Sequence, residues 1–86
     1  MPELSRFYGI TIRMHTADHN PPHFHAEVGE HEAIFNIIDG VFMKGYLPSK
    51  EARLVLAWYE IHKEELINNW NNLTEGKPHT KILPLK

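Results

Sequence analysis

Residues 23–38 read HFHAEVGEHEAIFNII, and this stretch predicts two neighbouring antiparallel β-strands. Residues 23–28 alternate between polar and apolar side chains, a period of two that is typical of a half-buried strand. We expect Gly29-Glu30 to form a tight connection, after which residues 31–38 resume strand character less cleanly. The polar face of the first strand carries His23, His25 and Glu27. The stretch therefore predicts a hairpin with one apolar face and one polar face that bears histidines.

The segments on either side of this hairpin extend it into a meander. Residues 7–15 alternate in the same way and include β-branched side chains, which predicts one further strand. The Pro-Pro pair at residues 21–22 lacks backbone N–H donors and predicts a loop before the hairpin. Asp39-Gly40 is a hairpin signal, and residues 41–47 would then close an antiparallel sheet of three to four strands.

A single long helix is predicted after the sheet. Ser49 can cap its first turn, with Pro48 just outside, and Gly76 and Pro78 stop it. Apolar residues recur along it at three-and-four spacing, namely Ala52, Val55, Leu56, Tyr59, Leu66, Trp70 and Leu73. From Ser49 to Leu73 the helix would measure roughly 37 Å, which is at least the width of a compact domain of this size. Part of it could therefore project and offer its apolar stripe to a partner.

Two segments complete the fold prediction. The asparagine-rich residues 68–72 are expected to fray, because asparagine is a poor helix former. The apolar tail, residues 81–85, is expected to lie back on the sheet edge. The sequence thus predicts one α+β domain, residues 1–86. It consists of a small antiparallel β-meander of three to four strands followed by one long C-terminal α-helix packed on the sheet.

Composition narrows the class of protein. The absence of cysteine excludes a disulfide scaffold and a thiolate metal site, and it fits a reducing cytosol. The N-terminal sequence does not resemble a signal peptide, and no apolar run approaches the roughly 20 residues that cross a bilayer. We therefore expect a cytoplasmic protein without membrane contact. The net charge of −2 argues against a protein that coats nucleic acid.

The seven histidines provide the strongest candidate site. His23 and His25 lie two apart on the expected strand, so their side chains emerge on one face, and His19 precedes the proline turn. Three imidazoles with an open fourth position would describe a zinc site, whereas a carboxylate in place of one would favour iron or manganese. Further polar candidates are Asp18, Glu27 and His31. The alternative is that these residues are turn formers and exposed polar side chains, with a structural or partner-binding role.

Other candidate chemistry is weaker. Arg6 and Arg13, with Lys44 and Arg53, could form a patch that contacts nucleic acid, although scattered charges are more often a solvated surface. The pattern positions no serine or threonine against a His–Asp pair, and no glycine-rich phosphate loop is present. The sequence leaves open whether the protein is an enzyme.

Three strings together resemble a known family. They are RFYGI at residues 6–10, DHNPPHFHA at residues 18–26, and LVLAW at residues 54–58 in a helix that begins after Leu47-Pro48. The chain resembles the bacterial "domain of unknown function 4160" family over essentially its whole length. The tail, residues 81–85, also resembles the ending of that family.

The resemblance implies a protein partner and no particular reaction. Members of the family look like small stand-alone proteins, often encoded beside another small protein in an arrangement similar to a toxin–antitoxin pair. The leading hypothesis is therefore a cytosolic protein-interaction module, either a homodimer or bound to the small protein encoded nearby. The resemblance assigns no catalytic residue to any position of this chain.

Overall fold

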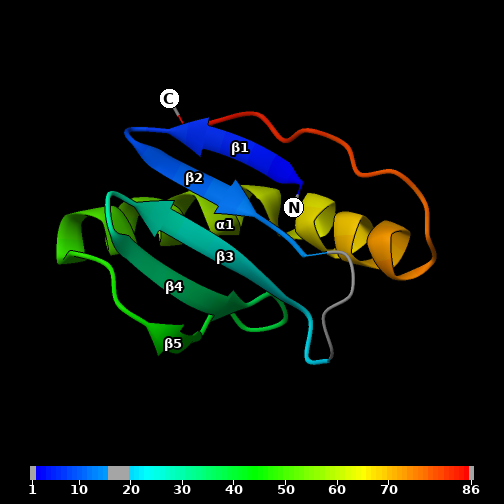
Figure 1. Cartoon of the computed structure of the whole chain (residues 1–86), viewed down its shortest axis with the longest axis horizontal. Coiled ribbons are helices and arrows are strands. Elements are labelled where there is room, and N and C mark those ends of the chain that lie inside the picture. The colour runs from blue at the N-terminus through cyan, green and yellow to red at the C-terminus, as the bar shows by residue number, and fades with distance from the viewer. Residues whose placement is uncertain (1, 16–19, 86) are drawn as a thin grey trace.

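The computed structural model describes residues 2–15 and 20–85, so Asp18 and His19 lie outside the described residues. It contains five strands and one helix in these ranges (Figure 1). Their bounds are β1 Glu3–Phe7, β2 Ile10–Arg13, β3 His23–Val28, β4 His31–Asn36, β5 Phe42–Gly45 and α1 Ser49–Thr74. The order along the chain is the predicted one, a set of strands followed by a single long helix.

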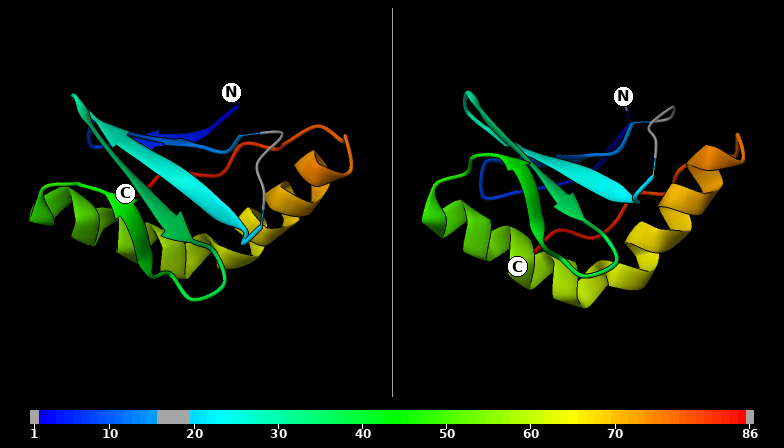
Figure 2. Two further views of the ribbon diagram at one scale, coloured as in Figure 1. Left: turned by 60° about the horizontal axis from the view of Figure 1, so that its bottom comes forward. Right: turned by 90° about the horizontal axis from the view of Figure 1, so that it is seen from below.

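The strands form one antiparallel sheet in which each strand pairs with its neighbours in sequence, in the order β1-β2-β3-β4-β5. Helix α1 crosses one face of this sheet and leaves the other face without a helix (Figures 1 and 2). The predicted α+β class and the meander are thus confirmed, and the sheet has five strands where three to four were expected.

The additional strand comes from a hairpin that the sequence pattern concealed. Residues 7–15 were expected to form one strand, but Tyr8 and Gly9 have φ angles of 49° and 78° and reverse the chain, so that Phe7 pairs with Ile10. Positive φ at both central residues is the type I′ hairpin geometry, which glycine adopts readily and tyrosine rarely. Because tyrosine is not a typical turn residue, the sequence pattern did not predict a turn at Tyr8. The strand before it, β1, was therefore not predicted either.

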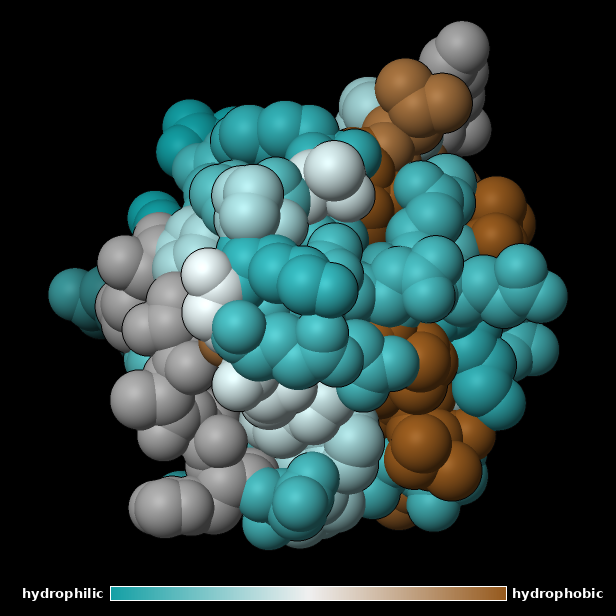
Figure 3. All heavy atoms as spheres, turned by 90° about the vertical axis from the view of Figure 1, so that its right-hand side faces the viewer, coloured by the Kyte–Doolittle hydropathy of each residue, from teal (hydrophilic) through white to brown (hydrophobic). Residues whose placement is uncertain are grey.

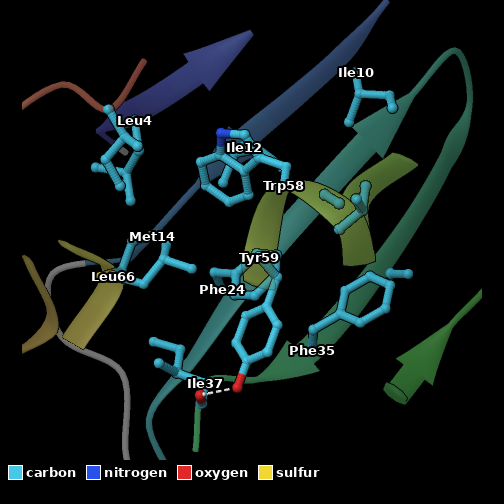
Figure 4. Close-up of a cluster of buried hydrophobic side chains, with 14 of the residues drawn as sticks. Leu4, Ile10, Ile12, Met14, Phe24, Phe35, Ile37, Trp58, Tyr59 and Leu66 are labelled. Atoms are coloured by element: carbon cyan, nitrogen blue, oxygen red, sulfur yellow. Dashed lines mark hydrogen bonds between the residues drawn. The ribbon is translucent and has the colours of Figure 1, made fainter. Parts of the chain in front are cut away.

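The core lies between the sheet and α1 (Figure 4). Trp58 of α1 is fully buried, with its ring 5.4 Å from that of Phe7 and 6.0 Å from that of Phe24. Tyr59 is also buried, and its hydroxyl donates a hydrogen bond of 2.5 Å to the carbonyl of Ile37. Burying an aromatic or branched aliphatic side chain contributes about 1.5–3 kcal/mol each. This interlayer packing fixes which sheet face is covered and which is open.

The start of α1 differs from the prediction, whereas its end agrees with it. Ser49 lies within the helix and makes no capping hydrogen bond, because Pro48, with φ −56° and ψ 148°, occupies the N-cap position. At the other end Gly76 has φ 76°, its N–H donates to Leu73, and the N–H of Lys77 donates to Asn72. These two bonds form a Schellman motif, so the predicted glycine stop is confirmed.

The second half of α1 packs against the molecule instead of projecting or fraying. The helix bends at His62, whose backbone is not helical (φ −115°, ψ 20°), as Figure 2 shows. Beyond the bend Asn69, Trp70 and Leu73 are buried. Figure 3, which views the end of the molecule where α1 finishes, shows a predominantly hydrophilic surface. The expectation that residues 68–72 fray is therefore wrong, because tertiary contacts override the low helix propensity of asparagine.

The tail returns along the sheet, as predicted. The N–H of Ile82 donates a 2.8 Å hydrogen bond to the carbonyl of Leu4 in β1, and the indole N–H of Trp58 donates to the carbonyl of Leu83. Figure 1 shows this segment running beside β1. One edge of the sheet is therefore covered by the chain itself.

Candidate functional site

The open face of the sheet carries the polar residues of the alternating strands. In β3, Phe24 and Ala26 are fully buried in the core, so the residues between and beside them point to the opposite face. His25 occupies the middle of that face, with Arg13 of β2 and Ile34 of β4 as its cross-strand partners. The predicted polar, histidine-bearing face is thus present and lies on the side of the sheet opposite the core.

Three side chains meet on this face and form what we call the triad, namely His15, His25 and Glu32. The Nδ1 atom of His25 lies 3.1 Å from Oε2 of Glu32. The rings of His15 and His25 are stacked, with centroids 3.9 Å apart and an interplanar angle of 27°. One ligand atom from each of the three residues lies within 4.8 Å of the other two. The triad therefore places two imidazoles and one carboxylate within 4.8 Å of one another.

Strand register explains why these three residues meet. Arg13 is the direct partner of His25, so His15 follows two positions further along, just beyond β2. Ile34 is the other direct partner, and Glu32 precedes it by two positions in β4. The triad is thus a diagonal line across three strands, and diagonal neighbours at about 7–8 Å are within reach of long or aromatic side chains.

The members of the triad differ in solvent exposure, and an ion pair lies beside them. His25 is 7% exposed, because neighbouring side chains cover it, whereas the Glu32 side chain is half exposed. Beside the triad, Nε of Arg13 lies 3.2 Å from Oε1 of Glu27 and forms an ion pair with it. The predicted candidate Glu27 is therefore engaged with Arg13, and the carboxylate that faces His25 belongs to Glu32.

His23 lies next to the triad. Its ring centroid is 5.4 Å from that of His25 and 5.3 Å from that of Trp70 on α1. Its Nδ1 is 2.7 Å from the carbonyl of Pro21. A carbonyl only accepts, so this bond requires the proton on Nδ1. Of the predicted set, His23 and His25 are thus brought together, and His19 lies outside the described residues.

The remaining sequence candidates lie apart from the triad. His31 is exposed on β4, and its ring packs edge-on against Tyr46 with centroids 5.1 Å apart. Arg6 donates a 2.8 Å hydrogen bond to Glu3, and this bond lowers the pKa of the Glu3 carboxyl. Arg6 and Arg13 both take part in ion pairs, and the nucleic-acid hypothesis stays a prediction.

Sequence reasoning did not identify two members of the triad, His15 and Glu32. His15 had a usable signal, because it continues the alternation of Arg13 and so falls on the polar face. Glu32 had none, since its place diagonal to His25 depends on the register between β3 and β4. A one-residue shift in that register would move its side chain to the other face.

The second candidate functional site, after the triad, is the free edge of the sheet at β5. Every residue of this strand is exposed, and it pairs only with β4 in the part of the chain that the structure describes. Large apolar side chains are exposed in and around it, namely Ile38, Val41, Phe42, Met43 and Tyr46. We call this surface the β5 edge. Its exposure contrasts with β1, which the tail covers.

The protein is thus a small α+β domain in which one long helix packs on an antiparallel meander. It carries a diagonal histidine–carboxylate triad and one apolar free edge. The model of the domain of unknown function DUF4160 matches residues 9–71, and the chain belongs to that family. No curated protein and no solved structure matches the chain. Among the described residues, no helix combines the length and apolar character needed to cross a bilayer.

Proposed function

We propose that this protein is a small protein-interaction module that binds its partner along the β5 edge, as one component of a toxin–antitoxin-like pair. The observation that carries the proposal is the exposure of Phe42 and Met43, 46% and 44%, on a strand with an open side. Unpaired edge strands are templates for a strand from another chain, and proteins usually protect them.

A difference between the two edges of the sheet supports this assignment. The outer side of β1 receives the tail through the Ile82–Leu4 hydrogen bond. The β5 edge has no such cover among residues 2–15 and 20–85, and it carries a cluster of apolar side chains. A strand that is added to β5 would satisfy its free backbone groups and remove these apolar side chains from water.

Charge favours a different protein over a second copy as the occupant. Lys44 is exposed in the short strand β5. Antiparallel pairing of β5 with itself in the register that sets Lys44 opposite Lys44 would bring two ammonium groups together on one face, which is unfavourable. The partner that fits has an apolar strand with a carboxylate opposite Lys44. The family's resemblance to one half of a two-gene pair supports a small partner encoded nearby.

The test is complex formation between this chain and the product of the neighbouring gene, measured by size-exclusion chromatography with light scattering and by titration calorimetry. Met43→Asp should weaken the complex by more than about tenfold, because it places a charge in a desolvated contact. Lys44→Glu should weaken it less. Ile61→Asp is the matched control, since Ile61 is an exposed apolar residue of α1 and its substitution should leave affinity unchanged.

A growth assay tests the paired role in cells. Expression of one gene alone should arrest growth, co-expression should restore it, and Met43→Asp should abolish that rescue. Absence of a complex, or equal weakening by Ile61→Asp, would contradict the proposal. A dimer of this chain alone that is disrupted by Met43→Asp would assign the edge to self-association and overturn the partner assignment.

A further inference from the structure

We infer that His15, His25 and Glu32 form a binding site for a divalent transition metal of the two-histidine, one-carboxylate type. The site lies on the open face of the sheet and is independent of the β5 edge and of the function proposed for that edge. Its members differ from the His19, His23 and His25 set that the sequence suggested, because strand register brings other residues to His25.

Distances are the first argument. Zinc binds imidazole nitrogen and carboxylate oxygen at about 2.0–2.2 Å, which places two such atoms about 3.3 Å apart at a tetrahedral angle. The His25 Nδ1–Glu32 Oε2 separation is 3.1 Å. One ring nitrogen of His15 lies within 4.8 Å of a ligand atom of His25 and of a ligand atom of Glu32. Because the His15 ring is stacked on that of His25, it must turn out of this stack to direct a nitrogen at the same ion.

Rigidity is the second argument. His25 is buried in the middle of β3, a central strand bonded on both sides to β2 and β4. Glu32 is anchored in β4, while His15 lies two residues beyond the end of β2. Ligands that are held by strands keep their geometry before the ion arrives, which reduces the ordering cost of binding. Glu32, half exposed, gives an ion access from solvent.

Charge and donor type select the kind of ion. As ligands, two neutral imidazoles and one carboxylate offer a net charge of −1, and among the described residues the adjacent Arg13–Glu27 ion pair adds no net charge. Nitrogen and oxygen donors without thiolate suit Zn²⁺, Fe²⁺ or Mn²⁺ more than soft ions. Three protein ligands leave at least one coordination position open, as in catalytic and not in closed structural sites.

The direct test is titration of tag-free protein with Zn²⁺ by calorimetry. Wild-type protein should bind one ion, and Glu32→Gln and His15→Gln should each weaken binding by more than about tenfold, since even loss of an outer-shell contact costs that much. His31→Gln is the matched control, an exposed histidine one residue before Glu32, and should bind as wild type. His23→Gln separates this site from the sequence-based set and should also retain binding.

The position of the bound ion can be measured independently with Mn²⁺, whose unpaired electrons broaden nearby NMR signals. The ring signals of His15 and His25 should broaden at lower Mn²⁺ concentrations than the ring signal of His31, whose side chain is not a ligand in the proposed site. Circular dichroism of each variant confirms that it is folded. Failure of wild-type protein to bind Zn²⁺, equal loss in the His31→Gln control, or retention of binding in Glu32→Gln would overturn the site.

Discussion

Asn69 and Thr80 are joined by two hydrogen bonds that tie the tail to α1. The Asn69 side-chain amide donates to the Thr80 carbonyl at 3.1 Å, and its oxygen accepts from the Thr80 N–H at 2.7 Å. Asn69 is fully buried, and its amide also donates to the Glu65 carbonyl. A side chain with low helix propensity thus holds the segment that covers the edge of β1.

Removal of this clamp should destabilise the protein. Asn69→Ala leaves the paired backbone groups of Thr80 without their partner, and we expect the free energy of unfolding to fall by about 2–4 kcal/mol. Urea denaturation followed by circular dichroism measures the change. Asn68→Ala, at an exposed neighbouring position, should stay within about 0.5 kcal/mol. Equal effects of the two substitutions would show that the clamp contributes nothing specific.

Gly45 is required for the close approach of β5 to β4. A Cβ atom at this position would lie 2.1 Å from the carbonyl oxygen of Glu32, and φ is 91°. Gly45→Ala should therefore cost more than about 2 kcal/mol, because backbone must move in addition to the conformational strain. Gly29→Ala has positive φ but an open surrounding, so thermal unfolding should show a smaller loss of about 1 kcal/mol. A larger loss at Gly29 would contradict this account.

Tyr59→Phe tests the contact between α1 and the loop after β4. The substitution keeps the ring that packs near Gly40 but removes the donor to the buried Ile37 carbonyl (Figure 4). An acceptor left without its partner costs about 1–3 kcal/mol. Denaturant unfolding should show this loss for Tyr59→Phe and almost none for Tyr46→Phe, whose hydroxyl is on an exposed side chain.

The Glu3–Arg6 pair should make stability depend on pH in acid. The Arg6 hydrogen bond lowers the pKa of Glu3 in the folded state below its unfolded value. The contribution is therefore present above the unfolded pKa and is lost as pH falls through the folded pKa. In Arg6→Gln the pKa of Glu3 should rise, which an NMR titration of its side-chain carboxyl measures. An unchanged titration midpoint would refute the role of Arg6.

The effect of Zn²⁺ on the unfolding temperature provides a second test of the triad. If the triad binds Zn²⁺, saturating ion should raise the unfolding temperature, because binding to the native state alone stabilises it. Acidification should abolish this shift, since protonated imidazole cannot ligate. The rise should disappear in Glu32→Gln and persist in His31→Gln. A rise that persists in Glu32→Gln would place the ion elsewhere.

Features that depend on local pattern could be predicted from the sequence. Alternation over residues 23–28 indicated β3 and its polar face, Asp39-Gly40 indicated the turn before β5, and Gly76 indicated the end of α1. Each is a property of a few consecutive residues, because strand period and positive-φ turns are set by neighbouring side chains. The placement of His23 and His25 on one face followed from the same rule.

Tertiary structure alone decided which residues meet across elements. The turn at Tyr8 is held in a conformation that tyrosine rarely adopts, Asn69 is ordered by contacts with the tail, and α1 bends at His62. His15 and Glu32 join His25 only through the register of three strands. Sequence periodicity determines which face a side chain occupies. The neighbours it finds there depend on long-range pairing, which no local pattern encodes.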